Sequence, residues 1–149
     1  MDLNNDGVIN DKDRTFLGNP APTVIFALNN SFSYQGLDLS IFLQGIAGNE
    51  ICNANRFWSE AMAVAQNQTT ETLNRWTGSG TSNTMPRAIF NDPNKNTRPS
   101  DRYIEDGSYL RIKNVTLGYT LPKSLMKKAH ISSARLYVSA QNLYTFTNY

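Results

Sequence analysis

The chain has 149 residues, enough for one ordinary domain, and its 14 basic and 12 acidic residues leave a formal charge of +2. This balance does not indicate a nucleic-acid-binding protein, and no apolar run approaches the roughly 18 residues that a membrane helix needs. The hydrophobic content of 40% is somewhat low for a globular domain. A barrel wall around a wet interior, joined by long polar loops, would account for it.

The first predicted element is a polar, acidic loop at residues 2–13, with the sequence DLNNDGVINDKD. Its spacing is that of a calcium-binding loop, and calcium takes six to eight hard oxygen ligands. The loop ends in Asp rather than Glu and has no predicted flanking helix, so it is more similar to the calcium repeats of dockerins than to an EF-hand. A solvated turn rich in Asp, Asn and Gly is the alternative. The candidate calcium ligands are Asp2, Asn4, Asp6, the Val8 carbonyl and Asp13.

A β-hairpin is predicted next. Apolar and polar residues alternate over Thr23–Tyr34 and again over Leu37–Gly45, and Gln35-Gly36 forms the short connection. Alternation with a period of two indicates strands that present one apolar face.

Residues 46–102 have no sustained period of two and are rich in Asn, Thr, Ser, Gly and Pro. The spacing of apolar residues predicts a helix over Arg56–Gln66, and Thr70 is a candidate cap for a second short helix. A loop of this length is usually functional or disordered. Its large aromatic residues are candidate stacking groups for sugar rings, or alternatively a small core for the loop: Phe57, Trp58, Trp76 and Phe90.

A second hairpin is predicted near the end of the chain. Its strands are Tyr109–Leu121 and Ala134–Phe146, joined by a short basic connection at Pro122–Ser133. The alternation changes phase at Asn114, which predicts a bulge there or a strand end that rises above a membrane.

These elements predict an all-β fold: a partial antiparallel transmembrane β-barrel of about four strands in two hairpins, with long external loops that carry short helices. Outer-membrane barrels pair short periplasmic turns with long external loops. The expected division of the chain is a calcium-like external loop at 1–22, a hairpin at 23–45, a long external loop at 46–102 and a hairpin at 103–149. The alternative is a secreted, calcium-stabilised β-sandwich that binds carbohydrate, although sandwiches usually turn every 8–12 residues or so.

Little in the chain indicates catalysis. The single cysteine, Cys52, allows no internal disulfide, and with the single histidine, His130, it cannot form a metal cluster. Cys52 falls in a polar loop and His130 in a basic turn, so a nucleophile pair is not expected. A hydrolase would need a paired carboxylate or an activated nucleophile, and no spacing singles one out. We therefore expect that the protein is not an enzyme.

Six segments closely resemble the SusC/RagA family, the TonB-dependent outer-membrane transporters of Bacteroidetes-type bacteria. In chain order they are DLNNDGVINDKDRTFLGNPAP, FSYQGLDLSIFLQGIAGNE, LNRWTG, MPRA, DRYIEDGSYLRIKNVTLGYTLP and ARLYVSAQNLYTFTNY. The resemblance implies a large barrel that imports glycan fragments or peptides, is driven by the TonB complex and is covered by a SusD-like lipoprotein lid. It implies a location in the bacterial outer membrane and no nucleic-acid partner.

The resemblance runs from one end of the chain to the other, and no signal peptide is visible at the start. In that family the plug and the segment that contacts TonB lie upstream. We therefore expect a barrel portion from near the C-terminus of a longer transporter. Four strands cannot close a barrel, so we expect these residues alone to be insoluble or aggregated.

Overall fold

The structure is a computed structural model and describes residues 2–128 and 130–149. The chain divides into two compact units. The strand unit comprises Asn19–Glu50 and Asp106–Tyr149, and the loop unit comprises the chain up to Gly18 together with Ile51–Glu105. The strands and helices are β1 (Val24–Tyr34), β2 (Leu37–Ala47), β3 (Glu50–Cys52), α1 (Asn55–Ser59), β4 (Ile104–Asp106), β5 (Tyr109–Thr120), α2 (Lys123–Lys128) and β6 (Arg135–Thr147).

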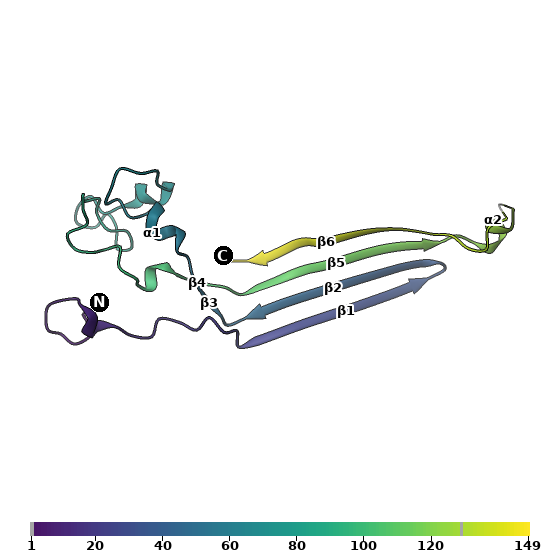
Figure 1. The fold of residues 1–149 in the computed structure, drawn as a ribbon, viewed down its shortest axis with the longest axis horizontal. Coiled ribbons are helices and arrows are strands. Elements are labelled where there is room, and N and C mark those ends of the chain that lie inside the picture. The colour runs from purple at the N-terminus through teal and green to yellow at the C-terminus, as the bar shows by residue number, and fades with distance from the viewer. Residues whose placement is uncertain (1, 129) are drawn as a thin grey trace. The chain divides into compact units, whose positions relative to one another are not determined.

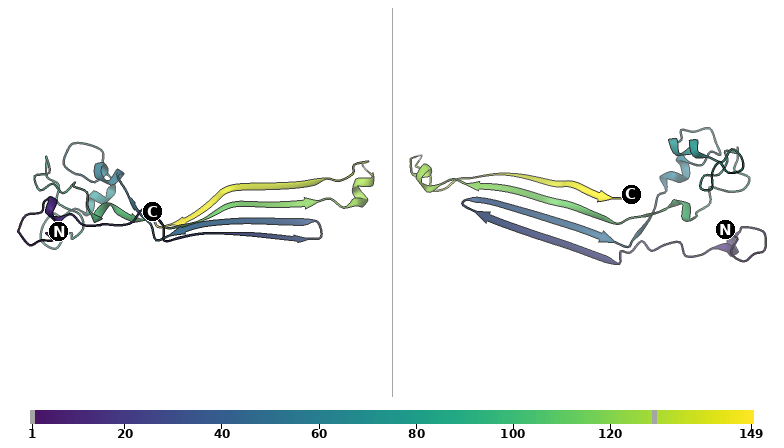
Figure 2. Two further views of the ribbon diagram at one scale, coloured as in Figure 1. Left: turned by 60° about the horizontal axis from the view of Figure 1, so that its bottom comes forward. Right: turned by 180° about the vertical axis from the view of Figure 1, so that it is seen from behind.

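The strand unit is one four-stranded antiparallel sheet in the order β1-β2-β5-β6. Figures 1 and 2 show the four long strands lying side by side in every view. The β1–β2 hairpin turns at Gln35 and Gly36, whose φ angles of 47° and 88° are both positive. Two consecutive positive φ angles are typical of the tight turn that matches the twist of paired strands. Both predicted hairpins are therefore confirmed.

The strand pairing assigns side chains to two faces of the sheet, because residues directly opposite each other lie on the same face. We call them the apolar face and the polar face. Large hydrophobic side chains that are solvent-exposed in this chain gather on the first: Val24, Phe26, Leu28, Phe32, Tyr34, Leu37, Leu117, Tyr119, Leu136, Val138, Tyr144 and Phe146. The polar face carries mostly Ser, Thr, Asn, Gln, Asp and Arg, although the exposed residues Ile25 and Tyr137 also lie on it.

A bulge keeps β5 in phase across this division. Phe42 pairs with Asn114 and Leu43 with Ile112, so Lys113 is an extra residue in β5. The pairing of β5 with β6 shifts at the same place, where Asn142 has a φ of 50°. An extra residue in one strand resets its alternation. Leu110 and Ile112 therefore join Val115 and Leu117 on the apolar face, which explains the phase change in the sequence.

The loop unit departs from the sequence prediction in its helices. The helix expected over Arg56–Gln66 is wrong beyond Ser59, because α1 ends there and Met62 has a φ of 52°, which is incompatible with an α-helix. The second predicted helix is a single 3₁₀ turn at Thr70–Asn74, and its N-cap residue is Thr69 rather than Thr70. Two further 3₁₀ turns occupy Asp11–Asp13 and Asp101–Tyr103.

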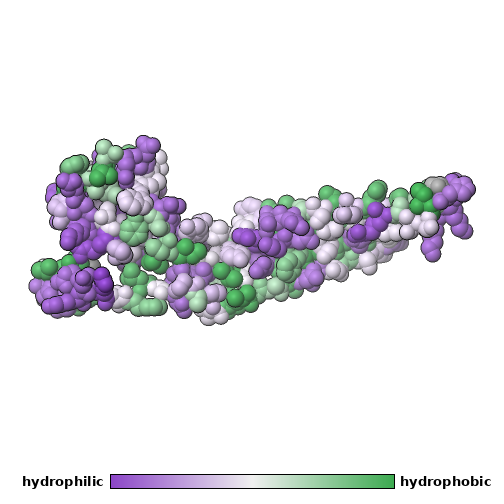
Figure 3. Space-filling model, viewed as in Figure 1, coloured by the Kyte–Doolittle hydropathy of each residue, from purple (hydrophilic) through white to green (hydrophobic). Residues whose placement is uncertain are grey.

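Three short elements were not anticipated. The basic connection after β5 contains the helix α2, in which Met126 is buried. The strands β3 and β4 pair in a separate two-stranded sheet. Each has only three residues, too few for a period of two to be visible in the sequence. Figure 3 shows hydrophobic and hydrophilic side chains interspersed along the side of the strand unit that is in view. Throughout the described chain, every helix is too short or too polar to cross a membrane.

Candidate functional site

The loop unit is organised around Tyr103, which is completely buried. Its ring stacks on Phe57 of α1, with ring centroids 4.0 Å apart and an interplanar angle of 18°. The Tyr103 carbonyl accepts a hydrogen bond from the Asn53 amide at 2.8 Å. Phe57, a predicted substrate-stacking residue, is half-buried and packs on this core residue.

Four charged side chains join the segments around this core. Glu60 has a side chain only 3% exposed and accepts from Arg56 Nε at 2.7 Å and from Arg102 Nη2 at 3.0 Å. Arg56 also contacts Glu105 Oε1 at 3.0 Å. Two guanidinium groups thus balance two carboxylates, and residues 56–60 are tied to residues 102–105.

The pKa of Glu60 reflects two opposing effects. Burial favours the neutral acid, but the hydrogen bonds from Arg56 and Arg102 stabilise the carboxylate more strongly, so the pKa of Glu60 lies below its ordinary value. Glu60 is therefore ionised at neutral pH. Its role is structural, because its two oxygens already have guanidinium partners.

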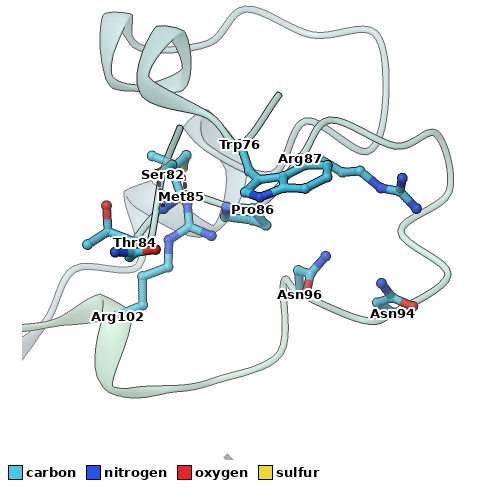
Figure 4. Close-up of a pocket in the computed structure, with 10 residues that line it drawn as sticks. Trp76, Ser82, Thr84, Met85, Pro86, Arg87, Asn94, Asn96 and Arg102 are labelled. Carbon is cyan, nitrogen blue, oxygen red and sulfur yellow. Dashed lines mark hydrogen bonds between the residues drawn. The ribbon is translucent and has the colours of Figure 1, made fainter. Parts of the chain in front are cut away.

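An open pocket of about 530 Å³ lies beside this network. A volume of this size falls within the usual range for small-molecule sites. The lining combines one indole, two guanidinium groups, two further apolar side chains and several small polar ones: Trp76, Ser82, Asn83, Thr84, Met85, Pro86, Arg87, Asn94, Asn96 and Arg102. Figure 4 shows the Trp76 ring above Asn94 and Asn96, with the Arg87 side chain extending beyond the indole.

The pocket walls are held in place by hydrogen bonds. The Trp76 amide donates to the Met85 carbonyl at 3.1 Å. On the opposite side, the two oxygens of Asp92 each accept at 2.8 Å, one from the Asn96 amide and the other from the Thr97 amide and hydroxyl. Burial raises the pKa of Asp92, but these hydrogen bonds together lower it by more than burial raises it. The pKa of Asp92 therefore lies below its ordinary value. The walls are therefore arranged before any ligand binds.

The four predicted aromatic residues do not form one site. Trp76 lines the pocket and is 37% exposed, whereas Phe57 is half-buried and stacks on Tyr103. Trp58 and Phe90 are 74% and 73% exposed, respectively, and lie outside the pocket lining. Contact of any of the four residues with a substrate stays a prediction.

Sequence reasoning missed the other lining residues, above all Arg87, Asn94, Asn96 and Arg102. They lie in turn-rich stretches, where no periodicity marks a shared surface. The only signals were the word MPRA, which contains Arg87, and the Asn-rich stretch NDPNKNT at residues 91–97.

The calcium-like loop is folded by its own polar side chains. Asp13 accepts from the amides of Leu3 at 2.9 Å and Asn10 at 2.7 Å, Asp6 from the Val8 amide at 2.9 Å and Asp2 from the Gly7 amide at 2.8 Å. The hydrogen bonds from the Asn10 and Leu3 amides hold the pKa of Asp13 below its usual value. The predicted ligands thus lie in one loop.

Two observations bear on whether calcium fits this loop. The Oδ1 atom of Asp2 is buried and has no hydrogen-bond partner among the described residues, which leaves an oxygen suited to a cation. However, no cluster of three or more His, Cys, Asp or Glu side chains in the described parts of the chain is arranged to hold a metal ion. The donor types fit calcium, but the carboxylates do not converge in this conformation.

Arg98 links the calcium-like loop to residues 92–98, which we call the pocket loop. Its Nη1 atom donates to the Ile9 carbonyl at 2.7 Å, while Nε and Nη2 donate to the carbonyls of Lys95 and Asn94 at 3.0 and 3.1 Å. One guanidinium group therefore spans two segments that are 89 residues apart in sequence. Asn94 belongs to the pocket lining, so the two features of the loop unit are physically connected.

No family model matches the chain, but individual proteins resemble it over nearly its whole length. TonB-dependent receptor P3 of Formosa agariphila is 38% identical over 148 residues, which cover 99% of this chain and 14% of that protein. TonB-dependent receptor P26 of the same organism is 34% identical over 151 residues, which cover 99% of this chain and 15% of that protein. TonB-dependent receptor SusC of Bacteroides thetaiotaomicron is 24% identical over a match that covers 100% of this chain and 14% of that protein.

Solved structures of the RagAB peptide importer resemble the fold. In its open-open state the match has a TM-score of 0.71 and 29% identity, and it covers 87% of this chain and 14% of that one. In its closed-closed state the TM-score is 0.72, again at 29% identity and the same coverage. The chain therefore spans about a seventh of the length of these relatives. All of them are named as receptors or importers, none as an enzyme.

Proposed function

Because the chain belongs to the SusC/RagA family of TonB-dependent receptors, we propose that it supplies barrel wall and external loops to an outer-membrane importer. The apolar face of the four-stranded sheet carries this proposal. Its side chains include Tyr34 at 71% and Val138 at 67% exposure. A large exposed apolar surface marks contact with lipid or with another protein.

The dimensions of the sheet support the same proposal. Its strands have 11 to 13 residues, and a tilted transmembrane strand needs about 9–11. A transmembrane barrel strand alternates between lipid and a polar interior. The polar face fits the interior, because its side chains bond to one another: Arg111 Nε donates to Thr145 Oγ1 at 2.9 Å, and the Thr116 and Ser139 hydroxyls are 2.9 Å apart.

The family relationship supports a proposal for the substrate and the partners. We assign glycan fragments or peptides as the substrate class, and the RagAB peptide importer supports peptides as one member of it. We further assign a SusD-like lipoprotein as the lid over the external loops and the TonB complex as the source of energy. The bacterial outer membrane is the corresponding location. A secreted carbohydrate-binding β-sandwich is not favoured, because the relatives that match 99% of the chain are named as receptors.

We also propose that the loop at residues 2–13 binds calcium and thereby stiffens an external loop. The buried, unpartnered Oδ1 of Asp2 supports this, and the ligands would be Asp2, Asn4, Asp6, the Val8 carbonyl and Asp13. Asp2→Asn keeps one oxygen for the Gly7 amide but replaces the other with an amide group. It should abolish calcium-induced slowing of hydrogen exchange in the loop. Asp11→Asn is the control, because Asp11 forms only the exposed pair with Arg14. No slowing by calcium in the unmodified protein would refute the proposal.

Adjacent residues at the middle of β1 test the barrel-wall proposal. Leu28 lies on the apolar face opposite Leu43, and Asn29 lies on the polar face opposite Phe42. An Arg facing lipid near the bilayer midplane costs about 2–4 kcal/mol, whereas an Arg facing the interior is tolerated. Leu28→Arg should therefore prevent accumulation of folded receptor in the outer membrane, and Asn29→Arg should not. Equal accumulation of the two variants would contradict the proposal.

A further inference from the structure

The pocket beside Trp76 is lined by positive charge without an opposing carboxylate. Its two charged residues are Arg87 and Arg102, and no Asp or Glu belongs to the lining. Arg102 is largely neutralised by Glu60, which lies 3.0 Å away. The Nε atom of Arg102 is buried without a hydrogen-bond partner among the described residues, so one guanidinium donor in this wall is still unused.

Arg87 is the charged residue of the lining that is accessible to a ligand. Its side chain is exposed, and no salt bridge within the described ranges involves it. The guanidinium carbon lies 6.0 Å from the centroid of the Trp76 ring, at the limit of a cation–π contact. A guanidinium group binds carboxylate or sulfate through paired N–H donors. Arg87 therefore provides an anion-binding group beside an aromatic surface.

The rest of the lining is neutral and polar. Asn83, Asn94 and Asn96 carry amides that both donate and accept, and Ser82 and Thr84 add hydroxyls. Figure 4 shows Asn94 and Asn96 on the side of the pocket opposite the Trp76 ring. The Asn96 backbone is fixed by Asp92 at 2.8 Å. A ligand between these walls meets an apolar plane on one side and hydrogen-bonding groups on the other.

We propose that this pocket binds an acidic saccharide unit, a sugar ring that carries a carboxylate or a sulfate. The C–H face of the ring would lie on Trp76, the hydroxyls would bond to the Asn amides, and the acidic group would bind Arg87. An acidic peptide side chain would satisfy Arg87, but it has no ring whose C–H face could lie on Trp76. The inference rests on the proposed importer function and specifies its substrate class.

The test measures binding to the intact receptor, purified in detergent. The probes are tetragalacturonate, its neutral methyl ester, a sulfated galactan tetrasaccharide, its desulfated form and a hexapeptide of glutamate. Arg87→Gln removes the proposed anion-binding group, and Arg14→Gln is its control, because Arg14 is an exposed arginine outside the pocket. Trp76→Ala removes the stacking surface. Phe16→Ala is its control, because Phe16 is an exposed aromatic residue of the loop unit that lies outside the pocket.

We expect at least one acidic saccharide to bind about tenfold more tightly than its neutral counterpart, which is the scale of one hydrogen bond to a charged group. Arg87→Gln should abolish this preference while leaving the weaker neutral binding in place. Trp76→Ala should weaken both, and the two control variants should match the unmodified receptor. Equal binding of acidic and neutral saccharides, binding of neither acidic saccharide, or a preference that persists in Arg87→Gln would each overturn the proposal. Tight binding of the glutamate peptide alone, lost in Arg87→Gln, would overturn it in favour of a peptide site.

Membrane fractionation separates this inference from the importer function on which it rests. If the receptor sits in the outer membrane and imports neutral glycans or peptides, but Arg87→Gln changes no binding preference, the importer function stands and the acidic-saccharide site is overturned. A protein absent from the outer membrane would lose the importer function, whatever its pocket binds.

Discussion

Arg135 of β6 reaches across β5 to pair with Asp38 of β2. The Arg135 Nε atom donates to Asp38 Oδ1 at 3.0 Å, and Nη2 contacts the other oxygen. Gly118 of β5 lies between them, and a Cβ built there would come within 2.6 Å of either Asp38 oxygen. The pair therefore exists in this form because β5 has no side chain at that point, and it connects two strands that are not neighbours in the sheet.

Gly118→Ala should separate this pair and destabilise the folded receptor. The atoms nearest to an added Cβ are the ends of the Arg135 and Asp38 side chains, so these two side chains must move apart. The urea midpoint of unfolding should fall, as followed by the heat-modifiable mobility of the folded protein. Gly78→Ala is the control, since a Cβ at Gly78 would meet nothing within 4 Å, and its midpoint should not fall. A Gly118→Ala variant as stable as Gly78→Ala would show that the Asp38–Arg135 pair can move without cost.

Glu60→Gln should loosen the loop unit. The substitution keeps the size of the side chain but leaves Arg56 and Arg102 without a buried counter-charge, and breaking such a pair costs about 3 kcal/mol. Hydrogen exchange of residues 51–105 in the intact receptor should lose roughly a hundredfold in protection, which follows from that free energy.

Glu71→Gln is the matched control for this change. Glu71 is exposed and accepts only a 3.4 Å hydrogen bond from Asn74, so its substitution should change protection little. If Glu60→Gln leaves the protection of residues 51–105 unchanged, the four-charge network does not stabilise the loop unit.

The loop unit should lose stability in acid. The pKa of Glu60 and that of Asp92 both lie below their ordinary values of 4.5 and 3.8. Carboxylates whose pKa is lowered by folding contribute their full stability above the ordinary value and lose it as pH falls through the lowered one. Exchange protection, corrected for intrinsic rates, should be constant from pH 8 to about pH 5 and fall below about pH 4.5. A smaller loss of protection in acid in Glu60→Gln would assign the loss to Glu60. Protection that increases in acid would contradict the prediction.

The sheet was predictable from the sequence because strand alternation is a local signal. The hairpins at Thr23–Gly45 and Tyr109–Phe146 follow from the period of two, and the phase change at Asn114 marked the bulge. The loop unit was not predictable in the same way. Arg56–Gln66 has helical spacing, but Glu60 at the end of α1 is held by Arg102, which is 42 residues away. Contacts of that range decide where the helix ends and which polar residues line the pocket.

Arg98→Ala should loosen both the calcium-like loop and the pocket loop, although the two are far apart in sequence. Arg98 supplies three hydrogen bonds, to the carbonyls of Ile9, Asn94 and Lys95. Removing it leaves those carbonyls to water and breaks the bond that connects the two loops. Hydrogen exchange should therefore increase in residues 2–13 as well as in residues 92–98.

Arg75→Ala is the control for Arg98→Ala, because Arg75 makes one 3.3 Å contact to the nearby Thr72 carbonyl. Its effect should stay within its own turn. If calcium binds residues 2–13, calcium should also slow hydrogen exchange at residues 92–98 in the unmodified receptor. It should not do so in Arg98→Ala, because the Arg98 guanidinium group forms the hydrogen bond between the two loops. An increase confined to residues 92–98 would mean that the hydrogen bond to Ile9 does not couple the two loops.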